Sequence, residues 1–114
     1  MKKKYSPHMQ ALISLVIKTS EYFANKHGLR WKKFDCSLKR RNYSGLCDYD
    51  GVITYRLKGR EPYQVLDLVA HELAHLAHFD HNEKWMRLHA ELLCDMLSEG
   101  VLQKIKEVCP ILPE

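Results

Sequence analysis

Residues 71–75 carry the sequence pattern that most clearly indicates a chemically reactive site in this chain. His71 and His75 enclose Glu72 in the sequence H-E-x-x-H, and His81 follows six residues after His75. Two histidines four residues apart lie on one face of an α-helix, one turn from each other. That spacing lets both imidazoles bind one zinc ion while the glutamate between them reaches a water molecule on the metal. The pattern therefore predicts metal-assisted hydrolysis.

The number of histidines matches what a catalytic zinc ion requires. Such an ion takes three protein ligands and keeps one coordination position open. We expect His71, His75 and His81 to bind one Zn²⁺ ion and Glu72 to act as the general base. Zinc would lower the pKa of its water from about 16 towards 7 and polarise the carbonyl that the water attacks. These residues predict a metallopeptidase with a protein or peptide substrate.

Other polar residues are candidates for supporting roles. His78 competes for the third ligand position, but in a straight helix it lies about 10 Å along the axis from His71. We therefore expect it beside the metal or at the helix end, where the helix dipole favours it. His89, Glu91 and Asp95 belong to the following helix, and we expect them at the surface or beside the ligands, where a carboxylate is a candidate for orienting a ligand imidazole. The sequence does not choose among the tyrosines that are candidates for a second oxyanion stabiliser, Tyr43, Tyr49, Tyr55 and Tyr63.

The segment that carries the motif reads as a buried helix. Pro62 suits its first position. Apolar side chains then cover most of its circumference, and a helix that is apolar nearly all round is buried. Polar groups on a buried helix need a partner, and a metal ion provides one. A histidine-rich surface helix, the alternative in a chain with 7 histidines, fits these flanks less well.

The chain must turn between the motif and His81. Ten residues of helix advance about 15 Å, too far for one metal ion to bridge. We expect the helix to end near His78, and Asp80 with Glu83 has the form of a capping box for the next helix. His81 would then be presented from the first turn of a helix whose apolar face begins at Trp85. Gly100 is expected to separate it from a short amphipathic segment, residues 101–108.

The first half of the chain predicts a helix and a small sheet. Ser6 and Pro7 are typical of a helix start, and Gly28 is typical of its end. Alternation of apolar and polar residues from position 31 to 57 predicts about three strands in a largely antiparallel sheet, with Asp50-Gly51 as a hairpin turn. If the strand at residues 53–57 forms an exposed edge, it offers a place for an extended peptide, and otherwise it is simply a packed strand. His8 and His27 fit ordinary surface positions.

Length and composition predict one soluble domain over residues 1–114, with a mild net charge of +4. Lys2–Lys4 and Lys39–Arg41 supply much of the positive charge, which fits solvated surface but leaves weak association with DNA open. No two of the four cysteines form a C-x-x-C pair, and Cys36, Cys47 and Cys94 fit small core positions. A reducing, cytoplasmic location is expected. No segment is long enough to span a membrane, and the sequence does not indicate an oligomeric state.

The motif and its flanks also resemble a known family. Residues 71–81, followed by Lys84-Trp85, are similar to the YgjP-like and WLM metallopeptidases, relatives of the SprT-like (Spartan-type) zinc proteases. The resemblance covers about residues 40–93 and is sharpest at the metal motif. It implies a minimal zincin-like α+β fold with an N-terminal helix, a small sheet, the H-E-x-x-H helix and a C-terminal helix. It also implies one zinc ion on His71, His75 and His81, Glu72 as general base, and peptidase activity, in some relatives on proteins crosslinked to DNA.

Two other functions stay open at this point. A domain of this size gains much of its stability from a bound metal, so a non-catalytic, zinc-stabilised module that binds DNA or protein is the first. The second is a protease that its basic clusters recruit to DNA-associated proteins, with binding that weakens steeply with salt. The group at the fourth coordination position of the metal distinguishes the first of these from a peptidase. A water molecule there allows catalysis, whereas a fourth side chain indicates a structural site.

Overall fold

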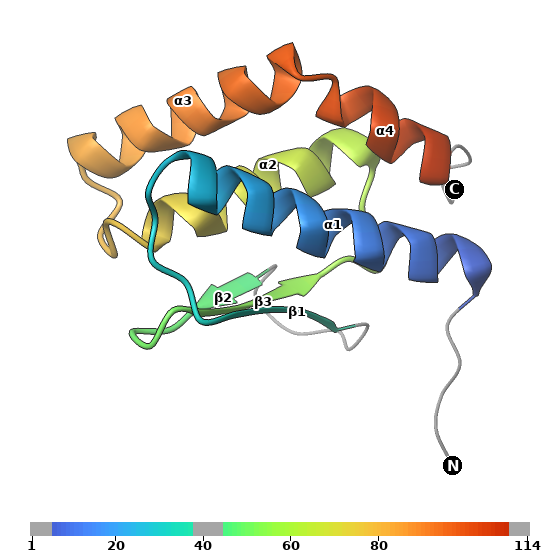
Figure 1. Ribbon diagram of the computed structural model, residues 1–114, viewed down its shortest axis with the longest axis horizontal. Coiled ribbons are helices and arrows are strands. Elements are labelled where there is room, and N and C mark those ends of the chain that lie inside the picture. The colour runs from blue at the N-terminus through green and yellow to red at the C-terminus, as the bar shows by residue number, and fades with distance from the viewer. Residues whose placement is uncertain (1–5, 38–44, 110–114) are drawn as a thin grey trace.

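A computed structural model of the chain describes residues 6–37 and 45–109. The predicted clusters Lys2–Lys4 and Lys39–Arg41, and Tyr43, lie outside these residues. The elements run in the order α1 (Pro7–Lys26), β1 (Lys33–Ser37), β2 (Gly45–Cys47), β3 (Val52–Arg56), α2 (Pro62–His75), α3 (Glu83–Ser98) and α4 (Val101–Val108). Figure 1 shows the sheet at the bottom of the view and the helices above it, with α3 and α4 farthest from the sheet. The predicted small α+β, zincin-like fold is confirmed.

Helix α2 lies at the centre of the molecule. It packs against each of the other helices and against β2 and β3. Val65, Leu66, Ala70, Leu73 and Ala74 are all fully buried, so apolar side chains surround the helix as its sequence predicts. The polar side chains of the H-E-x-x-H motif therefore project from a helix that the rest of the fold holds rigidly in place.

Helix α1 begins and ends where the sequence predicts. The Ser6 hydroxyl caps it by accepting a bond from the Met9 backbone N–H at 3.1 Å, and Gly28 follows its end with φ of 68°. Inside the fold, the hydroxyl of Ser20 donates to the Val16 carbonyl at 2.7 Å. Ser20 has one hydroxyl proton, so it accepts from the Tyr55 phenol, 2.8 Å away. This buried pair ties α1 to the centre of the sheet.

The sheet is mixed, which corrects the predicted antiparallel pairing. Its order is β1-β3-β2, with β3 parallel to β1 and antiparallel to β2. The chain reverses direction twice between β1 and β3, so these two strands point the same way, and β3 lies between its neighbours. The alternation of side chains shows which residues face the core but not which strands pair. Because β3 is paired on both sides, it is the packed strand of the two alternatives that the sequence leaves open, and the edge nearer α2 is β2.

The segment that joins α2 to α3 also differs from prediction at both ends. Helix α2 ends at His75, three residues earlier than expected, because the last N–H groups bond three residues back, from Leu76 to Leu73 and from Ala77 to Ala74. Helix α3 is capped by Asn82, not by Asp80: the Asn82 side-chain oxygen accepts from the Trp85 N–H at 2.9 Å. His81 thus precedes the helix, where the backbone is free to turn back towards α2.

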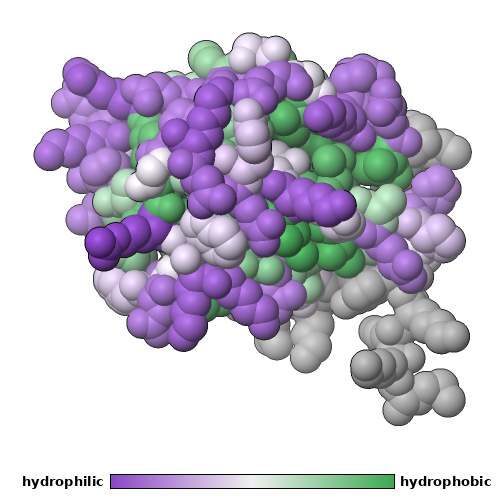
Figure 2. Space-filling view, viewed as in Figure 1, coloured by the Kyte–Doolittle hydropathy of each residue, from purple (hydrophilic) through white to green (hydrophobic). Residues whose placement is uncertain are grey.

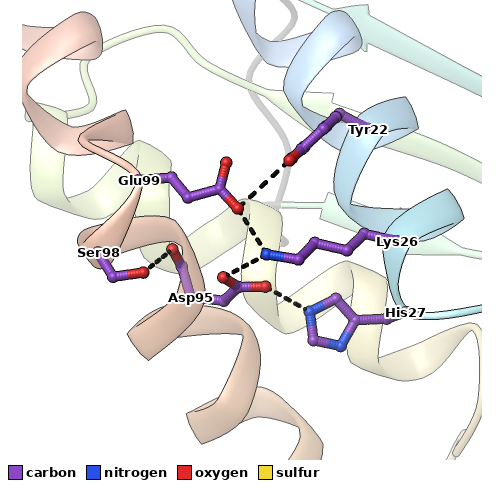
Figure 3. Close-up of polar contacts among 6 residues, drawn as sticks. All are labelled: Tyr22, Lys26, His27, Asp95, Ser98 and Glu99. Atoms are coloured by element: carbon purple, nitrogen blue, oxygen red, sulfur yellow. Dashed lines mark hydrogen bonds and ion pairs between the residues drawn. The ribbon is translucent and has the colours of Figure 1, made fainter.

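A polar cluster joins the C-terminal ends of α1 and α3 (Figure 3). Lys26 lies 2.8 Å from Asp95 and 2.6 Å from Glu99, and the His27 ring lies 2.8 Å from the other Asp95 oxygen. The phenol of Tyr22 donates to Glu99 at 3.3 Å. His27 is therefore not an ordinary surface residue, because its side chain is only 18% exposed and is held by the acid of another helix.

The surface is largely polar on the face shown in Figure 2, with apolar residues gathered between the helices. The cysteines are all free thiols, and Cys94 is exposed on α3, which corrects its predicted place in the core. Among the described residues, no helix has both the length and the apolar character needed to cross a bilayer.

Candidate metal centre

Three histidines converge at the C-terminal end of α2. The Nε2 atom of His75 lies 3.2 Å from that of His71 and 3.0 Å from that of His81, and the last two are 3.4 Å apart. His71 and His75 come from one face of α2, whereas His81 comes from the loop before α3. The structure therefore brings together the three histidines that the spacing singled out.

The three nitrogens fit one zinc ion. A tetrahedral ion with zinc–nitrogen bonds of about 2.0–2.1 Å holds its nitrogens about 3.3 Å apart, close to the separations of 3.0, 3.2 and 3.4 Å. Among the described residues, no fourth histidine, cysteine or carboxylate joins this group. His75 is buried, His71 is half-buried and His81 is exposed, so the group has one side open to solvent.

A backbone carbonyl fixes the orientation of His75. Its Nδ1 atom lies 3.0 Å from the carbonyl oxygen of His78. A carbonyl only accepts, so Nδ1 carries the proton and the lone pair of Nε2 points towards the other two imidazoles. His78 thus touches the site through its backbone, and its side chain is not part of the histidine group.

The surroundings favour the neutral form of the His71 and His75 imidazoles. The pKa of His71 is lowered to about 4, mainly by burial and to a lesser extent by nearby His75, His81 and His89. The pKa of His75 is also lowered, mainly by burial. A metal binds the neutral form of histidine, so at neutral pH the nitrogens of these two residues are available without loss of a proton.

Glu72 lies beside the histidines in a buried position. Its side chain belongs to α2 and is only 5% exposed, and one carboxylate oxygen lies 4.0 Å from His71 Nε2. Burial raises the pKa of this carboxyl to about 7, because removal from water disfavours the charged form. A carboxylate with such a pKa accepts and returns a proton readily near neutral pH.

Trp85 forms a wall of the site that the motif alone does not predict. Its ring lies edge-on to His71 and His81, with centroids 4.8 and 4.5 Å away, and 5.3 Å from His75. His89 stacks on Trp85, with ring centroids 4.8 Å apart, and its ring lies 5.9 Å from that of His71. Trp85 is 7% exposed. A rigid aromatic ring in contact with all three imidazoles restricts the orientations that they adopt.

Asp67 anchors His89, and Glu91 stays apart. The Asp67 carboxylate lies 2.9 Å from His89 Nε2, so α2 and α3 are joined one turn before His71. Glu91 is exposed on α3 and does not belong to the histidine group. The spacing of Asp67, His71 and His75, four residues each, was the signal that these side chains share one face of α2.

The tyrosines divide according to their environment. Tyr55 is fully buried and bonded to Ser20, and Tyr63 is exposed at the start of α2. Tyr49 follows β2 and stacks on Phe79, with ring centroids 4.3 Å apart. Phe79 belongs to the loop that carries His81, so the ring of Tyr49 packs against this loop.

The comparisons with known proteins give one result. A family model described as YgjP-like, metallopeptidase domain, matches residues 3–99 of the 114-residue chain. The search of the curated proteins and the search of the solved structures each found no match. The matched region contains the three histidines, Glu72 and Trp85.

Proposed function

The chain belongs to the YgjP-like metallopeptidase family, and from this premise we propose that it hydrolyses peptide bonds with one zinc ion on His71, His75 and His81 and with Glu72 as general base. One observation carries the proposal. Three imidazole nitrogens lie within 3.4 Å of one another, and the Glu72 carboxylate lies 4.0 Å from one of them. Three imidazoles beside a carboxylate match the donor set of a catalytic zinc site with an open position, which supports the proposal.

The chain's own residues divide the work. When bound, zinc would lower the pKa of a water molecule and polarise the carbonyl of the substrate. Glu72 takes the proton from the attacking water on a carboxylate oxygen and later gives it to the leaving amine. The position of Glu72 suits both steps, because its carboxylate lies 4.0 Å from His71 Nε2, beside the place where the three imidazole nitrogens meet.

The substrate approaches, in this proposal, along β2. This strand is the sheet edge that packs against α2. The pKa of the Cys47 thiol on β2 is raised to about 12, mainly by burial and next by the charge of the Glu72 carboxylate. Cys47 therefore lies close to Glu72. An extended peptide that pairs with this edge would place its backbone beside Glu72.

A glutamine at position 72 tests the general base. The Glu72→Gln variant keeps the size of the side chain but removes its basicity, so cleavage of casein is expected to fall at least a hundredfold while one zinc ion per chain is retained. Glu107→Gln, an exposed acid on α4, is the matched control and is expected to cleave at the wild-type rate. Undiminished cleavage by the Glu72→Gln protein would sink the proposed mechanism.

The same experiment separates the peptidase from its alternative. If the chain is a non-catalytic zinc module, it still binds zinc and gains stability from it, but the zinc-loaded wild type cleaves no peptide. The absence of a fourth protein ligand within the described residues supports the peptidase, since structural zinc sites are closed by four. Action on DNA-associated proteins stays a prediction that rests on basic clusters outside the described residues.

A further inference from the structure

A mixed pocket lies beside the metal centre. It has a volume of about 300 Å³, and three parts of the chain line it. Arg30 and Trp31 follow α1, residues 48–51 form the turn between β2 and β3, and Leu76 and Phe79 come from the segment that follows α2. A volume of this size holds one large amino-acid side chain.

The turn that forms one wall is fixed by its own hydrogen bonds. One Asp48 oxygen accepts from the backbone N–H groups of Asp50 and Val52 at 2.9 and 3.1 Å. Gly51 has φ of 88°, and a Cβ atom there would lie 3.2 Å from the Lys32 nitrogen. The Gly51 carbonyl accepts from the Lys32 N–H at 2.8 Å, so the turn is docked onto the segment after α1.

The pocket presents aromatic faces to solvent. Tyr49 is 86% exposed and Phe79 is 40% exposed, although their rings stack on each other at 4.3 Å. Trp31 is held by a bond from its indole N–H to Asn25 at 2.9 Å. Exposed rings held in place offer both an apolar surface and the negative face that attracts a cation.

The charges of the pocket add to this preference. Asp48 and Asp50 carry two carboxylates, and Arg30 carries one guanidinium, which leaves a local charge of −1. The whole chain has a net charge of +4, so the sign at this pocket is opposite to that of the molecule. An aliphatic stem that ends in a cation matches a pocket with aromatic walls and carboxylates.

Residues that line the pocket adjoin residues of the proposed active site along the chain. Leu76 directly follows the ligand His75, and Phe79 precedes His81 by two residues. On the other wall, Asp48 directly follows Cys47, the residue of β2 that lies near Glu72. A peptide paired with β2 would therefore leave that strand at the pocket, with its scissile bond near Glu72.

We propose that this pocket binds a lysine or arginine side chain of the peptide substrate, close to the scissile bond. The inference rests on the proposed peptidase function and adds the class of substrate. Tyr49 and Phe79 would contact the aliphatic stem, and Asp50 would attract the cationic end. Asp48 adds negative charge, but the turn already uses one of its oxygens.

The test compares peptides that differ at a single position. A panel of otherwise identical fluorogenic peptides carries arginine, norleucine or glutamate at each position near the scissile bond. At one position we expect the zinc-loaded full chain to show kcat/KM about tenfold higher for arginine than for norleucine, and lowest for glutamate. The ratio of arginine to norleucine should fall about threefold in Asp50→Asn, fall about tenfold in Asp50→Lys, and rise in Arg30→Gln. Glu107→Gln is the control and leaves the ratio unchanged.

A binding measurement keeps this inference separate from the proposed function. A peptide with arginine or norleucine is titrated into the zinc-loaded Glu72→Gln protein, which cleaves too slowly to interfere, and the ring protons of Tyr49 are followed by NMR. If wild type cleaves no peptide, the peptidase proposal fails, while arginine-dependent shifts at Tyr49 still support the pocket. Equal kcat/KM for arginine and norleucine at every position overturns the inference. So does a ratio of arginine to norleucine that Asp50→Lys leaves unchanged, or a Tyr49 ring whose proton signals do not shift when the arginine peptide is added.

Discussion

At the scale of single residues, the site combines a local pattern with packing that the pattern does not contain. The sequence predicts His71, His75 and His81 because a helix of known pitch places the first two together and excludes the third from the same straight helix. It does not predict the His78 carbonyl that orients His75, because a backbone bond leaves no mark on residue type. It names His89 as a candidate for a supporting role and Trp85 as the start of an apolar face, but it does not predict that their rings stack beside the histidines.

Trp85 is expected to set the affinity of the site for zinc. Its ring contacts all three histidines, so Trp85→Leu should weaken zinc binding about tenfold, the lower range for residues that support metal ligands. Trp85→Phe, which keeps a ring, should recover most of the affinity. The measurement is competition with a chromophoric chelator, together with the visible spectrum of the cobalt-loaded protein. A folded Trp85→Leu protein with wild-type affinity and spectrum would contradict this role.

At the scale of elements, helices follow the sequence more closely than the sheet does. The start of α1 at Ser6 and Pro7, and the separate helix after Gly100, depend on contacts within a few residues and are confirmed. The parallel pairing of β1 with β3 depends on residues about nineteen apart, which no local pattern encodes. The sequence predicts Asp80 as the cap of α3, whereas Asn82 caps it in the structure. Both residue types are good caps, so the sequence alone does not choose between them.

The cap of α3 should couple helix stability to metal binding. Asn82→Ala removes the bond to the Trp85 N–H and should cost about 1 kcal/mol in the free energy of unfolding. Because His81 directly precedes this cap, zinc affinity should also fall, by up to about fivefold. Ser6→Ala removes the equivalent cap of α1, and it should cost a similar amount while zinc affinity stays unchanged. Equal effects of the two variants on zinc affinity would refute the coupling.

The polar cluster between α1 and α3 should make stability depend on pH. Lys26 and then His27 hold the pKa of Asp95 below its usual value, so the carboxylate contributes stability above about pH 4 and loses that contribution as acid protonates it. Asp95→Asn should therefore destabilise the protein at pH 7 and much less at pH 3. Urea unfolding of both proteins at the two pH values measures this. A difference that does not shrink at pH 3 would count against the assignment.

At the scale of the whole molecule, one core unites the fold. Buried residues from all four helices and from β1 and β3 form a single cluster, which supports our proposal that residues 1–114 make one domain. The metal site lies where α2, the most central helix, ends and the chain turns towards α3. Hydrophobic pattern predicts that α2 is buried, but the layering around it depends on packing between distant segments. The pocket beside β2 is invisible in the sequence for the same reason, because its three walls come from separate segments.

The most direct test is X-ray absorption spectroscopy at the zinc edge on the full chain loaded with zinc. The predicted result is one zinc per chain with three imidazole nitrogens at about 2.0–2.1 Å and one oxygen that belongs to no protein side chain. The His81→Ala variant should lose one of the imidazole nitrogens. A sulfur atom, a fourth imidazole, or a spectrum that His81→Ala leaves unchanged would contradict a three-histidine site with an open position.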